Sequence, residues 1–204
     1  MTAKAKNSRE RILECAEALI LQKRFTATSI DEILEHAAIT KGGFFYHFDG
    51  KNGLARALIE RYLEQDDEIF LGLMKQADSL SEDPLHRLLI FLKLMAEMMG
   101  ELEGAHPGCL VASFTYENQQ FDEEIRELMK SGILAWRELI SSRLKQVSEL
   151  YPVETDVSIE TLADMFTASI EGGIILSRAL NDKQLLVDQI LAYRAYLRVL
   201  SGAQ

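Results

Sequence analysis

The sequence contains few prolines, few cysteines and no long apolar run, and each scarcity excludes a class of protein. Three prolines in 204 residues leave room for long, uninterrupted helices. The two cysteines, Cys15 and Cys109, lie far apart, which excludes a disulfide framework and fits a reducing compartment. No run of about 18 apolar residues is present to span a bilayer, and the N-terminus has no apolar signal core. We therefore expect a cytoplasmic protein without a membrane partner.

Positive charge is also scarce, because 22 Lys and Arg stand against 32 Asp and Glu and give a formal charge of −10. Duplex DNA is bound by cations that neutralise phosphates, so this excess argues at first against DNA binding. The distribution changes that conclusion. Residues 1–51 hold eight Lys and Arg against seven Asp and Glu, a net charge of +1, and the rest of the chain carries −11. This asymmetry suits a small DNA-binding head on an acidic body, although an uneven spread without functional meaning is the alternative.

The spacing of apolar residues predicts an all-α fold. Apolar side chains recur at intervals of three and four rather than in alternation, which is typical of helices and not of strands. About nine helices are expected, over residues 8–23, 29–37, 41–48, 51–77, 84–100, 109–117, 121–150, 158–180 and 183–200. The second and third of these are short and are separated by a tight break, which makes them a helix-turn-helix candidate.

The most specific motif lies between Thr26 and Tyr62, where the sequence is TATSIDEILEHAAITKGGFFYHFDGKNGLARALIERY. This segment closely resembles the signature of the TetR family of repressors. The resemblance rests on its Thr-Ser helix start, the Lys-Gly start of the next helix, the aromatic pair, and the His-Phe and Lys that follow. The resemblance covers about residues 9–62. It implies an N-terminal three-helix DNA-binding head and a helical C-terminal domain for ligand sensing and dimerisation. We place the DNA-binding domain at 1–50, a connector helix at 51–77 and the C-terminal domain at 78–204.

Ten residues of this motif are candidates for DNA binding. Those expected to hold the phosphate backbone are Thr28, Ser29, Tyr46, His47 and Lys51. Those expected on the exposed side of the recognition helix are Thr40, Lys41, Gly42, Gly43 and Phe45. Lys41 can reach guanine acceptors in the major groove, and Phe45 a thymine methyl. The two glycines would let the backbone approach the duplex closely, or they simply permit a sharp turn.

Two positions depart from the family pattern. The family usually has glycine where Ala38 stands in the turn, and Gly50 adds flexibility directly before Lys51. These departures leave the fold intact but affect the angle of the recognition helix.

The C-terminal part resembles one TetR subgroup through GCLVASFTYE at 108–117 and EGGIILSRALND at 171–182. The resemblance implies a homodimer in which the last two long helices of each subunit, about 158–180 and 183–200, form a four-helix interface. Paired heads would then reach successive major grooves roughly 34 Å apart on a pseudo-palindrome. The interface candidates are Gly172, Gly173, Leu186, Ile190, Tyr193, Leu197 and Leu200.

The helices around 84–100, 109–117 and 121–150 are expected to enclose a ligand cavity. Methionine and aromatic side chains suit an adaptable apolar pocket, and the lining candidates are Met95, Met98, Met99, Cys109, Phe114, Tyr116, Trp136 and Phe166. The alternative for each is an ordinary core position. Cys109 follows a glycine at a helix start, where a thiolate could react with electrophiles or oxidants, or it is an inert buried cysteine.

Together these features predict a ligand-responsive repressor that binds a pseudo-palindromic operator as a homodimer and is released by a small-molecule or reactive-species effector. We expect no cofactor and no metal. An enzyme on the same fold is one alternative, but the histidines at 36, 47, 86 and 106 are scattered and no HExxH, GxSxG, Walker A or GxGxxG motif is present. A helical adaptor without DNA binding is the other. The sequence does not distinguish repression from activation, although repression is the commoner outcome in the family.

Overall fold

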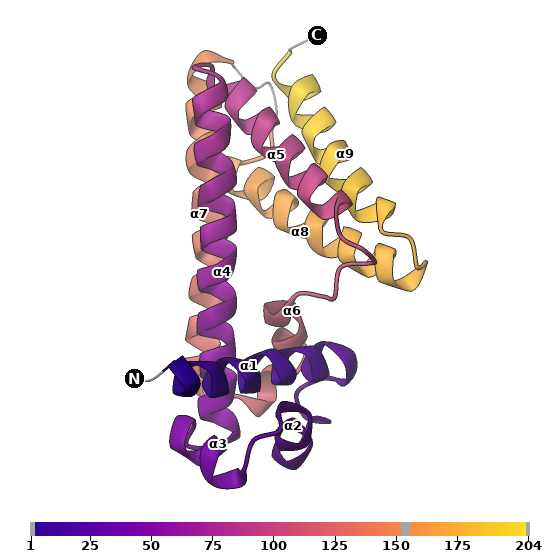
Figure 1. Cartoon of the computed structure of the whole chain (residues 1–204). Coiled ribbons are helices and arrows are strands. Elements are labelled where there is room, and N and C mark those ends of the chain that lie inside the picture. Colours follow the sequence, from indigo (N-terminus) through magenta and orange to yellow (C-terminus); the bar gives the residue numbers. More distant parts are fainter. Residues whose placement is uncertain (1–2, 152–155, 203–204) are drawn as a thin grey trace. The chain divides into compact units, whose positions relative to one another are not determined.

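The computed structural model describes residues 3–151 and 156–202, and these residues form nine α-helices and one short 3-10 helix, without a strand (Figure 1). The helices are α1 (Ala3–Lys23), α2 (Ile30–Ala37), α3 (Lys41–His47), α4 (Lys51–Leu80), α5 (Pro84–Gly100), α6 (Leu110–Thr115), η1 (Asn118–Gln120), α7 (Glu123–Leu150), α8 (Ile159–Ala179) and α9 (Gln184–Leu200). The all-α prediction is confirmed. No helix within the described ranges is both long enough and apolar enough to cross a membrane.

Two predicted helix bounds differ by three residues or more: α1 begins at Ala3 rather than at residue 8, and α4 ends at Leu80 rather than at residue 77. The polar stretch that begins at Asp78 was expected to end the fourth helix at Ala77, but α4 continues to Leu80. The extension has a partner in α7, because both guanidinium NH groups of Arg143 donate to the Asp78 carboxylate, each at 2.8 Å. A two-point pair of this kind fixes the last turn of α4 more firmly than its composition suggests.

Side-chain caps set several helix starts. Ser29 caps α2, Thr40 caps α3, Asp83 caps α5 and Ser158 caps α8, each by accepting a hydrogen bond from a backbone N–H in the first turn at 2.8–3.2 Å. Such a cap satisfies an N–H that has no partner inside the helix and contributes about 1 kcal/mol.

The chain divides into two compact units, which we describe separately. The first comprises Met1–Gln65 and Pro107–Ser131, and the second comprises Asp66–His106 and Gly132–Gln204. Helices α4 and α7 therefore contribute residues to both units. The predicted domain boundaries at 50 and 77 stay a prediction.

In the first unit, α1, α2 and α3 pack on one another and on the start of α4. Ile12, Ile33, Phe44 and Leu58 are fully buried there. Helix α6 lies against α1, and an aromatic cluster of Phe25, Phe114 and Phe121 joins the α1–α2 turn to the residues around α6, with ring centroids 4.7–5.2 Å apart. Aromatic pairs at this separation add about 0.5–1.5 kcal/mol each beyond their burial.

In the second unit, α9 packs on both α5 and α8 (Figure 1). The contact between α8 and α9 is close because of Gly173, where an added Cβ would lie 2.8 Å from Leu186 Cδ1 and 3.1 Å from its Cα. Tyr193 is buried in the same layer, and its hydroxyl donates to the carbonyl of Leu162 at 2.8 Å. A single chain thus buries one whole face of α9.

Candidate DNA-binding surface and associated sites

Helix α3 has one buried face and one exposed face. Phe44 is fully buried and Phe48, directly after the helix, is 5% exposed, so these two rings anchor α3 in the first unit. On the opposite side Phe45 is 50% exposed and Tyr46 77% exposed. The two exposed rings are adjacent on a short, capped helix, and contiguous exposed apolar surface of this kind is typical of interaction sites.

The start of α3 is open to a partner. Lys41 and Gly42 are exposed, and a Cβ added at Gly42 would meet nothing within 4 Å. Gly43 differs, because its added Cβ would lie 2.9 Å from Ile39 Cγ2. The backbone at Gly42 is therefore accessible from outside, whereas Gly43 serves the tight packing of the turn.

The two residues at the start of α2 are placed differently from each other. Ser29 is exposed at the cap, where its hydroxyl also accepts from the N–H of Glu32. Thr28 is fully buried, and its hydroxyl donates to the carbonyl of Arg24 at 2.8 Å. The expectation that Thr28 offers a hydroxyl to phosphate is corrected by this burial: its side chain fixes the α1–α2 turn.

His47 and Lys51 both have partners inside the first unit. His47 Nε2 lies 2.8 Å from the hydroxyl oxygen of Ser8 on α1. Lys51 Nζ donates to the carbonyl of Phe25 at 2.6 Å and lies 4.3 Å from the centroid of the same ring. Burial lowers the pKa of Lys51, and the nearby carboxylate of Glu117 opposes that shift. Phosphate contacts by His47 and Lys51 stay a prediction, and either would have to coexist with these bonds.

The two departures from the family pattern have backbone explanations. Ala38 ends α2 in the left-handed region, with φ 50° and ψ 49°, and its N–H donates back to the last turn of the helix. This is the conformation that usually selects glycine, so alanine is strained there by about 1 kcal/mol or more. Gly50 has φ +132°, which only glycine adopts without strain, so it fixes the entry to α4.

The predicted dimer residues divide between a buried and an exposed side. Within the single chain Leu186, Ile190, Tyr193 and Leu197 are at most 4% exposed, because they pack on α5 and α8. Their assignment to an interface with a second copy is thus corrected. Gly173 belongs to the same inner contact, and Leu200 is half-buried. Gly172 lies on the outer side of α8, with open space around an added Cβ.

The eight predicted pocket residues divide between the two units. In the first unit Phe114 belongs to the aromatic cluster with Phe25, Cys109 is 7% exposed and Tyr116 is 76% exposed. The other five lie in the second unit, where Met95, Trp136 and Phe166 are buried and Met98 and Met99 half-buried. A ligand contact by any of these residues stays a prediction.

Comparison with known proteins identifies this architecture. A family model described as bacterial regulatory proteins of the tetR family matches residues 12–58, and one described as the tetracyclin repressor-like C-terminal domain matches residues 84–192. The chain belongs to the TetR family of DNA-binding transcriptional regulators. Among the described residues of this TetR protein, no group of three or more His, Cys, Asp or Glu could hold a metal ion.

Several TetR relatives match over most of the chain. Transcriptional regulator AcuR of Cereibacter sphaeroides is 28% identical over 162 residues, 78% of this chain and 71% of the relative. The HTH-type transcriptional repressor NemR of Escherichia coli is 26% identical over 143 residues, 70% of each chain. An uncharacterised HTH-type regulator of Lactococcus lactis is 27% identical over 190 residues, covering 89% of this chain and 88% of the relative.

Solved structures show the same fold. A TetR-family regulator from Agrobacterium tumefaciens superposes with a TM-score of 0.77 at 18% identity, covering 96% of this chain and 98% of that one. The reduced form of E. coli NemR gives a TM-score of 0.72 at 22% identity, covering 91% and 94%.

One contact in this TetR head could not be predicted from the motif. Glu117, just beyond α6, accepts hydrogen bonds from both the backbone N–H and the hydroxyl of Thr26 in the α1–α2 turn. The two residues are 91 positions apart, and no periodicity links them. Together with the Phe25 cluster, this bond ties the residues around α6 to the turn that precedes α2.

Proposed function

We propose that this TetR protein is a repressor that binds a pseudo-palindromic operator as a homodimer and releases it when a small molecule binds. The proposal places its activity in the cytoplasm, where bacterial DNA lies. The observation that carries it is the exposed face of α3, on which Lys41, Phe45 and Tyr46 surround an accessible backbone at Gly42. A helix that exposes one face and is held in the core by the other, here through Phe44, is suited to insertion into the major groove.

The outer faces of α8 and α9 support dimerisation. On α8 an exposed or half-exposed set of small and apolar residues recurs at helical spacing, and its members are Met165, Ala168, Gly172, Ile175, Leu176 and Ala179. On α9 Leu191 is 38% exposed and Val199 77%. These side chains are separate from the inner stripe that packs against α5. A second copy related by a two-fold axis would cover them and would pair two heads.

We favour a small molecule over oxidation of Cys109 as the signal. Cys109 is 7% exposed, and its Sγ accepts from the N–H of Ala112 at 3.4 Å. Reactive thiols are usually accessible, so burial makes this cysteine a poor first target for an oxidant. The GCL motif that contains it, at 108–110, is the basis on which we place the chain in one TetR subgroup.

Selection from a random duplex library tests DNA binding against every possible operator sequence at once. The full chain is incubated with the library, and bound duplexes are amplified and sequenced. We expect two inverted half-sites with centres about one helical turn, or a multiple of it, apart. A library that shows no enrichment over several rounds would exclude a sequence-specific regulator.

The dimer is tested by charge placed on its proposed interface. Ile175 and Leu71 are similarly exposed, at 55% and 57%, on α8 and α4 respectively. Ile175→Glu should shift the sedimentation coefficient to that of a monomer and abolish binding to the selected duplex. Leu71→Glu is the matched control and should remain a dimer. A dimeric Ile175→Glu protein would place the interface elsewhere.

A further inference from the structure

We propose that an apolar cavity in the second unit, between α5, α7, α8 and α9, is a binding site for a small, neutral, largely apolar molecule that carries a hydrogen-bond donor such as a hydroxyl. The cavity has a volume of about 340 Å³, which lies at the small end of the range for ligand sites. None of the eight residues predicted from the sequence as pocket lining borders it.

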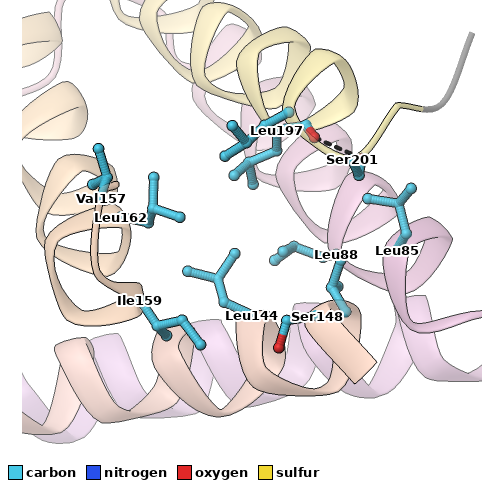
Figure 2. Close-up of a pocket in the computed structure, with 11 residues that line it drawn as sticks. Leu85, Leu88, Leu144, Ser148, Val157, Ile159, Leu162, Leu197 and Ser201 are labelled. Carbon is cyan, nitrogen blue, oxygen red and sulfur yellow. Dashed lines mark hydrogen bonds between the residues drawn. The ribbon is translucent and has the colours of Figure 1, made fainter. Parts of the chain in front are cut away.

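The lining comes from the ends of four helices. The residues that border the cavity are Leu85, Leu88, Leu144, Val147, Ser148, Val157, Ile159, Leu162, Leu197, Leu200 and Ser201. Figure 2 shows Leu88 of α5, Leu144 of α7 and Leu162 of α8 directed toward one shared space. All three side chains are at most 6% exposed, so the walls are part of the folded core while the space between them is empty of protein atoms.

The space is partly open to solvent, since Val157 on its rim is 39% exposed, but most of its walls are core side chains. Cores are packed about as densely as organic crystals, and side chains that face a void lose their dispersion partners. Water against these apolar walls finds few hydrogen-bond partners, so its displacement by an apolar molecule is favourable. The lining is therefore complementary to a hydrocarbon body.

The polar groups of the lining restrict the ligand further. All eleven lining residues are uncharged, so neither a carboxylate nor an ammonium would find a countercharge, and burial of an unpaired ion is strongly unfavourable. The Ser148 hydroxyl donates to the carbonyl of Lys145 at 2.8 Å, and the Ser201 hydroxyl donates to the carbonyl of Leu197 at 2.7 Å (Figure 2). With their protons used in this way, the two oxygens can only accept from a ligand.

The position of the cavity gives it a route to regulation. Its walls include the start of α8 and the end of α9, the two helices whose outer faces we propose for dimerisation. A molecule that binds more tightly to one arrangement of these helices than to another shifts the population toward that arrangement. This second step, and only this step, rests on the proposed function.

Calorimetric titration of the full chain with 1-butanol, 1-hexanol and 1-octanol tests the site directly. Affinity should rise about fourfold per added methylene as long as each methylene enters the apolar space.

Leu144→Phe and Ile159→Trp fill the cavity from α7 and α8, and each should abolish the rise in affinity with chain length. Leu134→Phe makes the same change at an exposed position of α7 and should leave it unaltered. Two variants are used so that one that fails to fold, as judged by circular dichroism, does not decide the result.

The chemistry is tested with molecules of similar length. Octanoate and octylammonium should bind far more weakly than 1-octanol, and 2-octanone, which has no donor, should bind more weakly than 2-octanol. Equal affinity of the ions and the alcohol would overturn the neutral site, and equal affinity of the ketone would overturn the required donor. Unchanged 1-octanol affinity in both filled variants would overturn the location.

The regulatory step is read separately, on the selected duplex. We expect 1-octanol to weaken duplex binding by wild type and Leu134→Phe but not by Leu144→Phe. A duplex affinity that is insensitive to a bound alkanol would overturn the regulatory step while the site stands. Failure of the proposed function is recognised differently, because the ligand-free protein would then select no duplex at all.

Discussion

Lys51 Nζ lies 4.3 Å above the ring of Phe25 and donates a hydrogen bond of 2.6 Å to the carbonyl of the same residue. One side chain at the start of α4 thus contacts both the backbone and the ring of Phe25, which lies in the turn between α1 and α2. The sequence motif assigns this lysine to phosphate. The structure gives it a second role, to hold the DNA-binding head together.

The structural role of Lys51 and its predicted phosphate contact have different consequences for a Lys51→Ala variant. Loss of the carbonyl bond and the cation–π contact in Lys51→Ala should lower the free energy of unfolding by about 1–3 kcal/mol, as measured by urea denaturation. Exposed Lys41→Ala should change it by less than about 0.5 kcal/mol. If Lys51 acts only on phosphate, its variant will be as stable as wild type, and the salt dependence of duplex binding will lose about one unit of slope.

Ala38 gives a prediction of opposite sign. Because Ala38 has φ 50°, Ala38→Gly should relieve strain and stabilise the protein by about 0.5–1 kcal/mol. The neighbouring Ala37 is buried inside α2, where the same change to glycine should destabilise by about 1 kcal/mol. Denaturation of the two variants under the same conditions gives the comparison. A destabilised Ala38→Gly protein would show that the left-handed turn is not strained.

Glu117 is expected to order the α1–α2 turn. Glu117→Ala removes the acceptor for both donors of Thr26, so amide hydrogen exchange of residues 24–28 should become faster. Glu127→Ala removes an exposed carboxylate that pairs with Lys130 on α7 and serves as the control. Equal exchange in both variants would mean that the Phe25 cluster alone holds the turn.

His106 is expected to make stability depend on pH. Burial, and then the positive charge of Arg178, lower the pKa of His106 in the folded protein. The unfolded chain therefore binds the proton more readily, and the free energy of unfolding should fall as pH drops below the unfolded value of about 6.5. His106→Gln should flatten this fall between about pH 7.5 and 5.5.

The matched control for His106 is His86→Gln, which alters a largely exposed side chain next to Asp83. It should retain the wild-type slope of stability against pH. A His106→Gln protein with an unchanged slope would assign the pH dependence to other groups.

The regular part of this fold is predictable because it depends on local rules. Capping by Ser29 and Thr40 and the apolar face of α3 with Phe44 follow from spacing within one helix. The division of α9 into a buried and an exposed side is not local. Tyr193 and Leu197 form a clear apolar stripe, but spacing alone does not say whether that stripe meets α5 of the same chain or a second copy.

The sites that depend on distant contacts could not be predicted. The motif alone does not show that Thr28 is buried. Nor does it show the hydrogen bonds Ser8–His47 and Thr26–Glu117, which join segments far apart in the sequence. The cavity is a similar case. Leu144 and Leu162 look like ordinary core residues in the sequence, and the space between them arises from how four helix ends meet.

We expect the exposed face of α3 to bind DNA in a sequence-specific way. This is tested by the affinity of wild type, Lys41→Ala and Tyr46→Ala for the selected duplex, measured by fluorescence anisotropy at several salt concentrations. Lys130→Ala, an exposed cation on α7, is the control. We expect each α3 variant to lose about tenfold or more in affinity and the control to bind as wild type does. Wild-type affinity in both α3 variants would contradict the account.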